Sequence, residues 1–406
     1  MIETLFSLAG RENIMPEIRS SEFVTGLSSP AEWLWDALGA VKSDAGVAVN
    51  ETVALNYATV FACIRVLSET LASVPLIVYR QLERGREKAP EHYAYRLLKE
   101  EPNPEISAST FIETLMQWAN RWGNAYALID WNRAGRARAL WPLAPQWMRV
   151  QRLNGRLVYS YEDRSSPWAG VYLAEDIIHI RTLGDDLVGW SPIRLARQSI
   201  GTGMAAALFG AKLFANGAKI GGILQVPGRL KDRQKFTEEF NKAYGSVENA
   251  HKTLVIDDGA KWVATTIPPD DAQFLETRKF QRSEIAAIYR VPPHLIGDLE
   301  RATFSNIEHQ SLEFIQYSML PWMTRFEQEF NRKLLGDGYF CRFLVAALLR
   351  GDMKSRYEAY NTGLRAGFLN QDEVRELEEM NPIPGGDVYR VQAQMVPLTQ
   401  LDGGEQ

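Results

Sequence analysis

The chain has 406 residues, 46% hydrophobic and 11% aromatic, so it is long enough for two or three compact units and too apolar for extensive disorder. Its net charge of −5, from 45 basic and 50 acidic side chains, disfavours a protein that grips nucleic acid by neutralising phosphates. The sequence contains neither a run of eighteen apolar residues nor a basic start followed by an apolar core. We therefore predict no membrane span and no secretory signal, and we expect a cytoplasmic setting.

Side chains that bind metals are few and scattered. Cys63 and Cys341 have no Cys or His neighbours at ligand spacing, so we expect two buried thiols rather than a disulfide or a zinc site. The histidines form no pair at helical ligand spacing and are interpreted as polar or capping residues: His92, His179, His251, His294 and His309. The sequence thus predicts no metal site and no cofactor.

The usual catalytic motifs are not present either. No glycine-rich phosphate loop ends in Gly-Lys-Ser or Gly-Lys-Thr, so a P-loop ATPase is excluded. Ser191 lacks the second glycine of a nucleophile elbow and is better explained as a helix N-cap. The paired carboxylates at 185–186, 257–258 and 270–271 fall at turns or helix starts, whereas a two-metal nuclease needs carboxylates that converge. We predict no catalytic residue.

The first 50 residues lack a sustained hydrophobic period, and we expect an arm of low order with one short helix at Pro30–Leu38. The compact part begins near Val53. Val74-Pro75 stops a helix there, and Leu76–Arg80 follows as a strand. The apolar face of this helix comprises Val60, Ile64, Leu67 and Leu71.

Helices and strands alternate in the region that follows. Tyr93–Lys99 is a short helix, and a longer one starts at Ser107–Thr110, where Thr110 and Glu113 have the spacing of a capping box. This helix is expected to bury Phe111, Leu115, Trp118 and Trp122. Gly123-Asn124 ends that helix, and Asn154-Gly155 is a hairpin turn signal. The predicted strands are Ala125–Trp131, Ala139–Leu143, Met148–Leu153, Arg156–Tyr161 and Asp176–Arg181.

Ser191-Pro192 opens a helix that runs to Asn216-Gly217, and its face rich in Ala and Gly permits the close approach of another helix. The glycine pattern at 201–206 lies inside this helix, so it is not a dinucleotide-binding turn. A small unit follows at 220–267, with a strand, a helix and a hairpin at Ile223–Val226, Lys231–Tyr244, and Lys252–Ile256 with Trp262–Thr266. So little sheet is unstable alone, and we predict that it is completed across a subunit boundary.

Residues 268–335 read as two helices joined by a short loop. The first helix is capped at Asp270 and ends at Val291-Pro292-Pro293. His294–Phe304 is expected to be non-helical, and Ser305 with Glu308 has the spacing of a capping box that opens the second helix. Pro321 lies inside the second helix and predicts a kink rather than a break.

The chain ends in a strand and two helices. Tyr339–Ala346 is the strand. Asp352 is placed to cap one helix, and Asn370 with Glu373 is placed to cap the last.

Several of these motifs, taken in order, resemble the HK97-like phage portal proteins. The central ones are Q-F-L-E-T-R-K-F at 273–280, E-I-A-A-I-Y-R-V-P-P at 284–293 and S-N-I-E-H-Q at 305–310. The N-terminal one is N-Y-A-T-V-F-A-C-I-R-V-L-S-E-T-L-A-S-V-P-L-I-V-Y-R at 56–80. The others are G-N-A-Y, L-x-P-L-x-P, D-I-I-H-I-R, R-G-D-M-K-S-R-Y, G-F-L-N-Q-D-E-V-R and N-P-I-P-G-G-D. The likeness spans residues 53–396, and the order of the motifs carries more weight than any one of them.

The resemblance implies an α+β portal fold, assembled as a ring, with an α+β wing, a helical stem, a small α/β clip and a helical crown. The implied division is an N-terminal arm (1–50), wing (51–190), stem helix (191–219), clip (220–269), second stem helix (270–293), tunnel loop (294–306), long kinked helix with a wing strand (307–350), and crown with tail (351–406).

The implied function is a phage or prophage portal at one capsid vertex, through which double-stranded DNA is packaged by the large terminase and later ejected. The expected partners are further copies in a ring of about twelve, the major capsid protein and a head-completion or adaptor protein, with no membrane. The expected location is the virion, with host cytoplasm during assembly. A metal-dependent nucleic-acid-processing enzyme and a monomeric head adaptor remain the alternatives.

The resemblance also assigns candidate site residues. The tunnel loop facing DNA would contain Asp298, Leu299, Glu300, Arg301, Ala302, Thr303 and Phe304. Arg301 is the candidate phosphate contact, with a solvated charge or an inter-subunit salt bridge as the alternative. Arg278, Lys279 and Arg282 are the candidate channel residues of the stem.

Overall fold

The structure, a computed structural model, describes residues 41–83, 85–215, 222–225, 235, 261–264, 271–299, 304–345, 353–378 and 380–390. The chain divides into two compact units: residues 1–62 with 191–289, and residues 63–190 with 290–406. Among the helices so described, none combines the length and apolar character needed to cross a bilayer.

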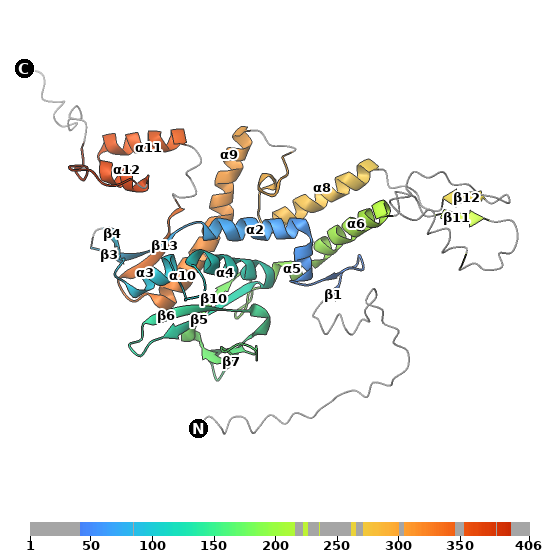
Figure 1. Cartoon of the computed structure of the whole chain (residues 1–406), viewed down its shortest axis with the longest axis horizontal. Helices are drawn as coiled ribbons and strands as arrows, with labels where there is room; N and C mark the ends of the chain where they lie inside the picture. The colour runs from blue at the N-terminus through green and yellow to red at the C-terminus, as the bar shows by residue number, and fades with distance from the viewer. Residues whose placement is uncertain are drawn as a thin grey trace, which may run out of the picture. The chain divides into compact units, whose positions relative to one another are not determined.

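The second unit is an α+β assembly of three antiparallel, three-stranded sheets (Figure 1). Their strand orders are β13-β3-β4, β10-β5-β6 and β7-β8-β9. The strands are β3 (Leu76–Gln81), β4 (Arg86–Lys88), β5 (Asn124–Trp131), β6 (Ala137–Leu143), β7 (Met148–Leu153), β8 (Arg156–Tyr161), β9 (Gly170–Leu173), β10 (Ile177–Arg181) and β13 (Tyr339–Phe343). The helices are α2 (Ala58–Ala72), which begins in the first unit, α3 (Tyr93–Lys99), α4 (Ala108–Trp122), α9 (Phe304–Glu313), α10 (Leu320–Leu334), α11 (Met353–Ala366) and α12 (Gln371–Leu377).

Helix α10 joins two of these sheets, because it contacts both β13 and β10. Its buried face contains Phe326 and Phe330, whose rings meet edge to face with centroids 5.9 Å apart. The Phe326 ring also approaches that of Phe343 on β13, at 6.5 Å. Cys63 and Cys341 are fully buried, which confirms their predicted role as small apolar side chains.

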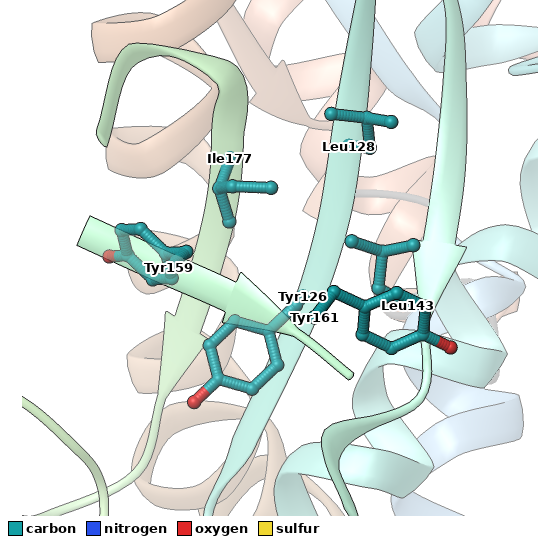
Figure 2. Packing of buried hydrophobic residues seen from close by; sticks show 6 residues of the cluster. All are labelled: Tyr126, Leu128, Leu143, Tyr159, Tyr161 and Ile177. Atoms are coloured by element: carbon teal, nitrogen blue, oxygen red, sulfur yellow. The ribbon is translucent and has the colours of Figure 1, made fainter. Parts of the chain in front are cut away.

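A second core lies between the sheet β10-β5-β6 and the sheet β7-β8-β9. Figure 2 shows its members on β5, β6, β8 and β10: Tyr126, Leu128, Leu143, Tyr159, Tyr161 and Ile177. The rings of Tyr126 and Tyr159 meet edge to face at 6.1 Å. Desolvation raises the pKa of both phenols, to about 12 for Tyr159, so both stay protonated at neutral pH.

The first unit is built on two helices that contact each other, α6 (Arg197–Ala215) and α8 (Asp271–Ile288). A short hairpin, β1 (Val41–Lys42) with β2 (Ala48–Val49), packs on α6. A Cβ added at Gly201 would lie 2.2 Å from the Ser43 hydroxyl, so the absence of a side chain there permits the contact. Helix α6 thus packs against a hairpin as well as against α8. The remaining elements are a 3-10 turn (Val53–Asn56), α5 (Pro192–Leu195), β11 (Gly222–Gln225) and β12 (Lys261–Ala264).

The expectation of a low-order arm through residue 50 is therefore wrong for residues 41–50, because the hairpin has a packing partner in α6. Residues 1–40, including the predicted helix at Pro30–Leu38, lie outside the described residues. The predicted strand at 223–226 is confirmed as β11, which pairs with β12. The predicted strand 252–256, and all of the helix 231–244 except Lys235, also lie outside them.

Most predicted elements of the second unit are confirmed, with corrections. Thr110 lies inside α4, and the cap is Ser107, whose hydroxyl accepts from the Thr110 N–H at 3.2 Å. Trp118 and Trp122 are only partly buried, because the core-facing side of α4 runs through Ile112, Met116 and Ala119 as well as Phe111 and Leu115. Strands β4 and β9 were not predicted. Each has only three or four residues, too few to show a period.

The predicted helix-loop-helix also needs correction. Pro293–Ile296 forms a 3-10 turn rather than a non-helical segment, and Ser305 lies inside α9 instead of capping it. The helix continues from Phe304 to Leu334 through a π-helical segment, Phe314–Met319, just before Pro321. In this segment the Leu320 N–H donates to the Ile315 carbonyl, five residues back. The prediction that Pro321 does not break the helix is thus confirmed, while the kink stays a prediction; the change in bonding is π-helical.

Candidate functional site

The three candidate stem residues lie on α8, in the first unit. Arg278 and Arg282 are four residues apart and Lys279 is three before Arg282, so they share one side of the helix. All three side chains are exposed, whereas Ile285 and Ala286 are buried. The Ser199 hydroxyl donates to Glu284 Oε1 at 2.9 Å and so links α6 to α8. The structure therefore brings these cations together on the exposed side of a packed helix.

Residues 290–298, which precede α9 in the second unit, form a compact turn. Arg290 adopts a left-handed backbone, with φ of 53°, which is uncommon for a side chain of this size. The Ser318 hydroxyl, in the π-helical segment, donates to the Arg290 carbonyl at 2.6 Å. The Asp298 N–H donates to the Pro293 carbonyl at 3.0 Å and closes the turn. The Ser318 hydroxyl thus links the π-helical segment to the turn at Arg290. Helical periodicity alone did not identify this contact.

His294 connects this turn to α9. Its Nδ1 lies 2.9 Å from Gln310 Oε1, and since an amide oxygen only accepts, Nδ1 is the donor. The Ser311 hydroxyl lies 3.5 Å from Nε2. His294 is thus a polar residue as predicted, but its spacing from Gln310 in the sequence gives no signal of this contact.

Only part of the predicted tunnel loop lies among the described residues. Asp298 is partly buried, and Leu299 is exposed over 62% of its surface. Phe304 is the first residue of α9. Glu300, Arg301, Ala302 and Thr303 lie outside the described residues.

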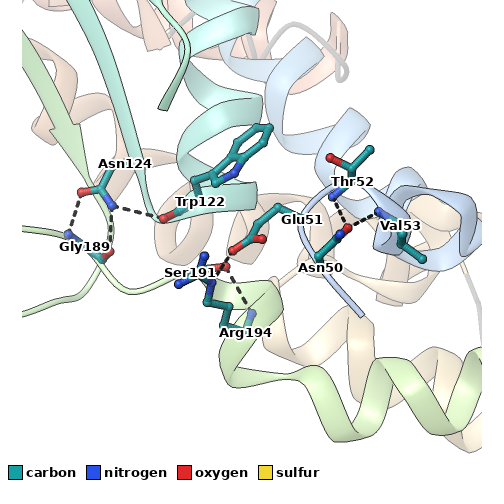
Figure 3. Close-up of polar contacts among 9 residues, drawn as sticks. All are labelled: Asn50, Glu51, Thr52, Val53, Trp122, Asn124, Gly189, Ser191 and Arg194. Atoms are coloured by element: carbon teal, nitrogen blue, oxygen red, sulfur yellow. Dashed lines mark hydrogen bonds and ion pairs between the residues drawn. The ribbon is translucent and has the colours of Figure 1, made fainter. Parts of the chain in front are cut away.

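A buried polar network joins β5, β10 and α10, and the sequence analysis did not predict it. Asn124 Oδ1 accepts from the Gly189 N–H at 2.7 Å and lies 3.0 Å from His179 Nε2 (Figure 3 shows Asn124 and Gly189). Asn124 Nδ2 donates to the carbonyls of Gly189 and Trp122, which fixes the orientation of the amide. His179 Nε2 must therefore carry the proton, and Nδ1 accepts from the Tyr159 hydroxyl at 3.1 Å.

This network holds His179 in its neutral form. Burial lowers the pKa of His179 well below its usual value, and the nearby cations Arg181, Lys333 and Arg332 lower it further. The His179 backbone N–H donates to Glu329 Oε1 on α10 at 3.1 Å. Two polar residues in otherwise apolar strands, Asn124 and His179, were the sequence signal for this network.

A separate polar cluster stabilises the start of α5 in the first unit. Ser191 Oγ accepts from the Arg194 N–H at 3.2 Å, which confirms its role as an N-cap (Figure 3). Arg194 also donates to the buried carboxylate of Glu51 at 2.6 Å. Ser191 therefore has a structural explanation that needs no nucleophilic role.

Of the paired carboxylates, Asp185 and Asp186 lie in a turn, whereas Asp257, Asp258 and Asp270 lie outside the described residues. Asp185 accepts from the backbone N–H groups of Leu187 and Val188, at 3.0 and 2.9 Å, and these bonds lower its pKa. Asp186 pairs with Arg152 at 2.9 Å. Throughout the described parts of the chain, no group of three or more His, Cys, Asp or Glu is placed to hold a metal ion.

Comparison with known proteins identifies the family. A sequence model described as "Phage portal protein" matches residues 58–379. The chain is 35% identical to the probable portal protein of Streptomyces phage phiC31, covering 91% of this chain and 83% of that protein. It is 34% identical to the portal protein of Enterobacteria phage HK97, covering 87% and 85%.

Solved structures agree on the fold. A chain in the virion of a native gene transfer agent particle has a TM-score of 0.56 at 23% identity, covering 86% of this chain and 99% of that one. A HK97 family portal protein from Corynebacterium diphtheriae has a TM-score of 0.55 at 13% identity, covering 74% and 97%. The family match covers most of the residues that form the two units, and the chain therefore belongs to the phage portal protein family.

Proposed function

We propose that copies of this chain form a closed ring of twelve at one capsid vertex, through which the terminase motor packages double-stranded DNA and from which the DNA is later ejected. The observation that carries the proposal is the family match over residues 58–379. A similar chain, at a TM-score of 0.53, comes from the neck of a native gene transfer agent particle computed with C12 symmetry. The large terminase, the major capsid protein and a head-completion or adaptor protein are the proposed partners. The virion vertex is the proposed location, after assembly in the host cytoplasm.

The ring is tested with the purified full-length chain. Twelve copies of 45.9 kDa should give a particle of about 550 kDa by mass measurement. Negative-stain images should show closed rings with a central hole. A monomer at every concentration tested would overturn the proposal in favour of a head adaptor.

Within this ring, the segment from Asp298 to Phe304 is proposed to face the DNA, with Arg301 as the phosphate contact. The exposure of Leu299 supports this proposal, because it leaves the side chain accessible to a passing duplex. Deleting 299–303 should leave ring assembly unchanged while altering the amount of DNA packaged. Loss of the ring would instead assign the segment a structural role.

The exposed cations of α8 are proposed to line the channel. Replacing Arg278, Lys279 and Arg282 with Gln should preserve rings and change DNA packaging, because a moving duplex responds to the charge of the wall. Arg164→Gln removes an exposed arginine elsewhere and is the matched control. Equal effects of the triple and control variants would remove α8 from the channel.

The proposed function is structural rather than enzymatic. Its support is the use of Asp185, Asp186 and Ser191 in turns, an ion pair and a helix cap. Plasmid DNA incubated with the protein and magnesium or manganese should remain intact. Cleavage that follows the protein through purification would favour the nuclease alternative.

A further inference from the structure

The second unit contains a groove between α10 and the loop 181–188. Its cavity measures about 600 Å³. Side chains of Arg325, Gln328, Glu329 and Arg332 form the α10 side, and the loop forms the other. A groove of this size accommodates several side chains of a peptide.

The acidic groups of this groove already have partners. Glu329 pairs with Arg332, and Asp186 pairs with Arg152. The Asp185 carboxylate accepts two backbone N–H groups of its own loop. Arg181 lies near enough to Asp185 to contribute to lowering its pKa, but no ion pair joins these three carboxylates to Arg181 or Arg325 among the described residues.

Two guanidinium groups of the groove lack a carboxylate partner among the described residues. Arg181 donates to the backbone carbonyl of Asp186 at 2.9 Å, and Arg325 lies over the ring of Trp322 at 4.9 Å. The charged neighbour of Arg325 is another cation, Arg290, and together with desolvation it lowers the pKa of Arg325. The groove consequently presents two arginines that form no ion pair with a carboxylate in the described part of the unit.

The groove also has an apolar rim. Leu183 is exposed over 71% of its surface, and Leu187 and Val188 are partly exposed beside it. Two cations, one on α10 and one at the start of the loop, together with an aliphatic rim suit a segment that combines carboxylates with large apolar side chains.

The chain itself contains such a segment. Residues 1–40 contain six acidic and two basic residues, and so account for −4 of the net charge of −5. Within them, Pro30–Leu38 reads P-A-E-W-L-W-D-A-L, with Glu32 and Asp36 four residues apart and two tryptophans between them. In the helix that the sequence predicts there, both carboxylates share one side, about 6 Å apart along the axis.

We infer that this groove binds the segment Pro30–Leu38 of a neighbouring copy, with Glu32 and Asp36 paired to Arg181 and Arg325 and the tryptophans against Leu183. The inference rests on the proposed ring, in which each copy would donate one segment and receive one. Such a contact is heterologous, as a closed ring requires. The contact would therefore help to set the order of subunits around the ring.

Cysteine cross-linking of the full-length chain tests this contact. Ala37→Cys with Leu183→Cys should give covalent oligomers after mild oxidation, because the natural thiols Cys63 and Cys341 are buried. Ala37→Cys with Val171→Cys is the matched control, since Val171 is 68% exposed and does not line the groove. Cross-linking no greater than this control, or linkage only within one chain, would overturn the inference.

Charge reversal adds a second test on the same cysteine pair. Arg181→Glu with Arg325→Glu should slow cross-linking about tenfold, as expected for two partly screened ion pairs. Glu32→Arg with Asp36→Arg in the same chain should restore it. Cross-linking that does not respond to either change would contradict the assigned pairs.

Negative-stain images of the same samples distinguish failure of the groove contact from failure of the proposed ring. Intact rings without the cross-link would overturn the groove contact and leave the proposed function standing. Absence of both rings and cross-links would overturn both.

Discussion

The two α-helices on either side of the π-helical segment, α9 and α10, differ in how much of their surface packs against the rest of the second unit. Helix α10 buries Trp322, Met323, Phe326 and Phe330 and contacts two sheets. Helix α9 extends away from those sheets (Figure 1), and its Leu312 is exposed over 52% of its surface. One continuous stretch of helix is thus anchored at its C-terminal end and projects at its N-terminal end. The change occurs at the π-helical segment, where the backbone bonding pattern also changes.

A continuous helix therefore need not be equally stable along its length. The free energy of unfolding should depend strongly on α10 and weakly on α9, because burial of apolar surface dominates stability. Substitutions along this stretch therefore test the difference in stability between α9 and α10.

The largest effect is expected at Phe326, which is fully buried and contacts the rings of Phe330 and Phe343. Phe326→Ala should lower the free energy of unfolding by about 3–5 kcal/mol, because it removes apolar contacts and leaves a cavity. Urea unfolding followed by tryptophan fluorescence measures this. A loss below about 1 kcal/mol would show that α10 is not the anchor.

The next effect concerns pH and the network that holds α10 to β10. Because His179 is buried and neutral, its pKa in the folded state is lower than in the unfolded chain. Its contribution to stability is then fully present above about pH 6.5 and is lost as pH falls below that value. Stability should therefore fall between pH 7 and pH 5.

His179→Gln isolates this contribution, since glutamine does not titrate. The variant should be less stable at pH 7, because hydrogen bonds to Asn124 and Tyr159 are disturbed. Its stability should also fall less between pH 7 and pH 5 than that of the parent chain. Identical pH profiles for the two proteins would show that His179 is not the titrating group.

A smaller effect is expected at the π-helical segment itself. Ser318→Ala removes the hydroxyl that donates to the Arg290 carbonyl and should cost about 1 kcal/mol. Hydrogen exchange should increase around Arg290 while the α10 amides remain protected. A global loss of protection would mean that this bond supports the whole unit.

The smallest effect is expected on α9. Leu312→Ser should change the free energy of unfolding by less than about 0.5 kcal/mol, because the side chain is half exposed in the unit. The same urea assay applies. A loss as large as that of Phe326→Ala would reveal a packing surface for α9 and would end the contrast between the two helices.

The elements whose signals are local could be predicted from the amino-acid sequence. Proline and glycine set the ends of helices and strands at Val74-Pro75, Gly123 and Asn154-Gly155, and Asn370 with Glu373 forms the predicted capping box of α12. The ordered motifs were sufficient for the family, because each is carried by residues adjacent in the chain. Backbone geometry and capping require only near neighbours, so they can be read without tertiary contacts.

Contacts between segments that are distant in the sequence could be identified only from the tertiary structure. The His179–Asn124 contact spans 55 residues, the bond from Ser318 to Arg290 spans 28, and the hairpin 41–49 is ordered by α6. The groove depends in the same way on α10 meeting the loop 181–188. Periodicity predicts which face of its own helix or strand a side chain occupies. The residue that this side chain contacts is fixed only when the elements pack together, because packing energy depends on segments that are distant in the chain.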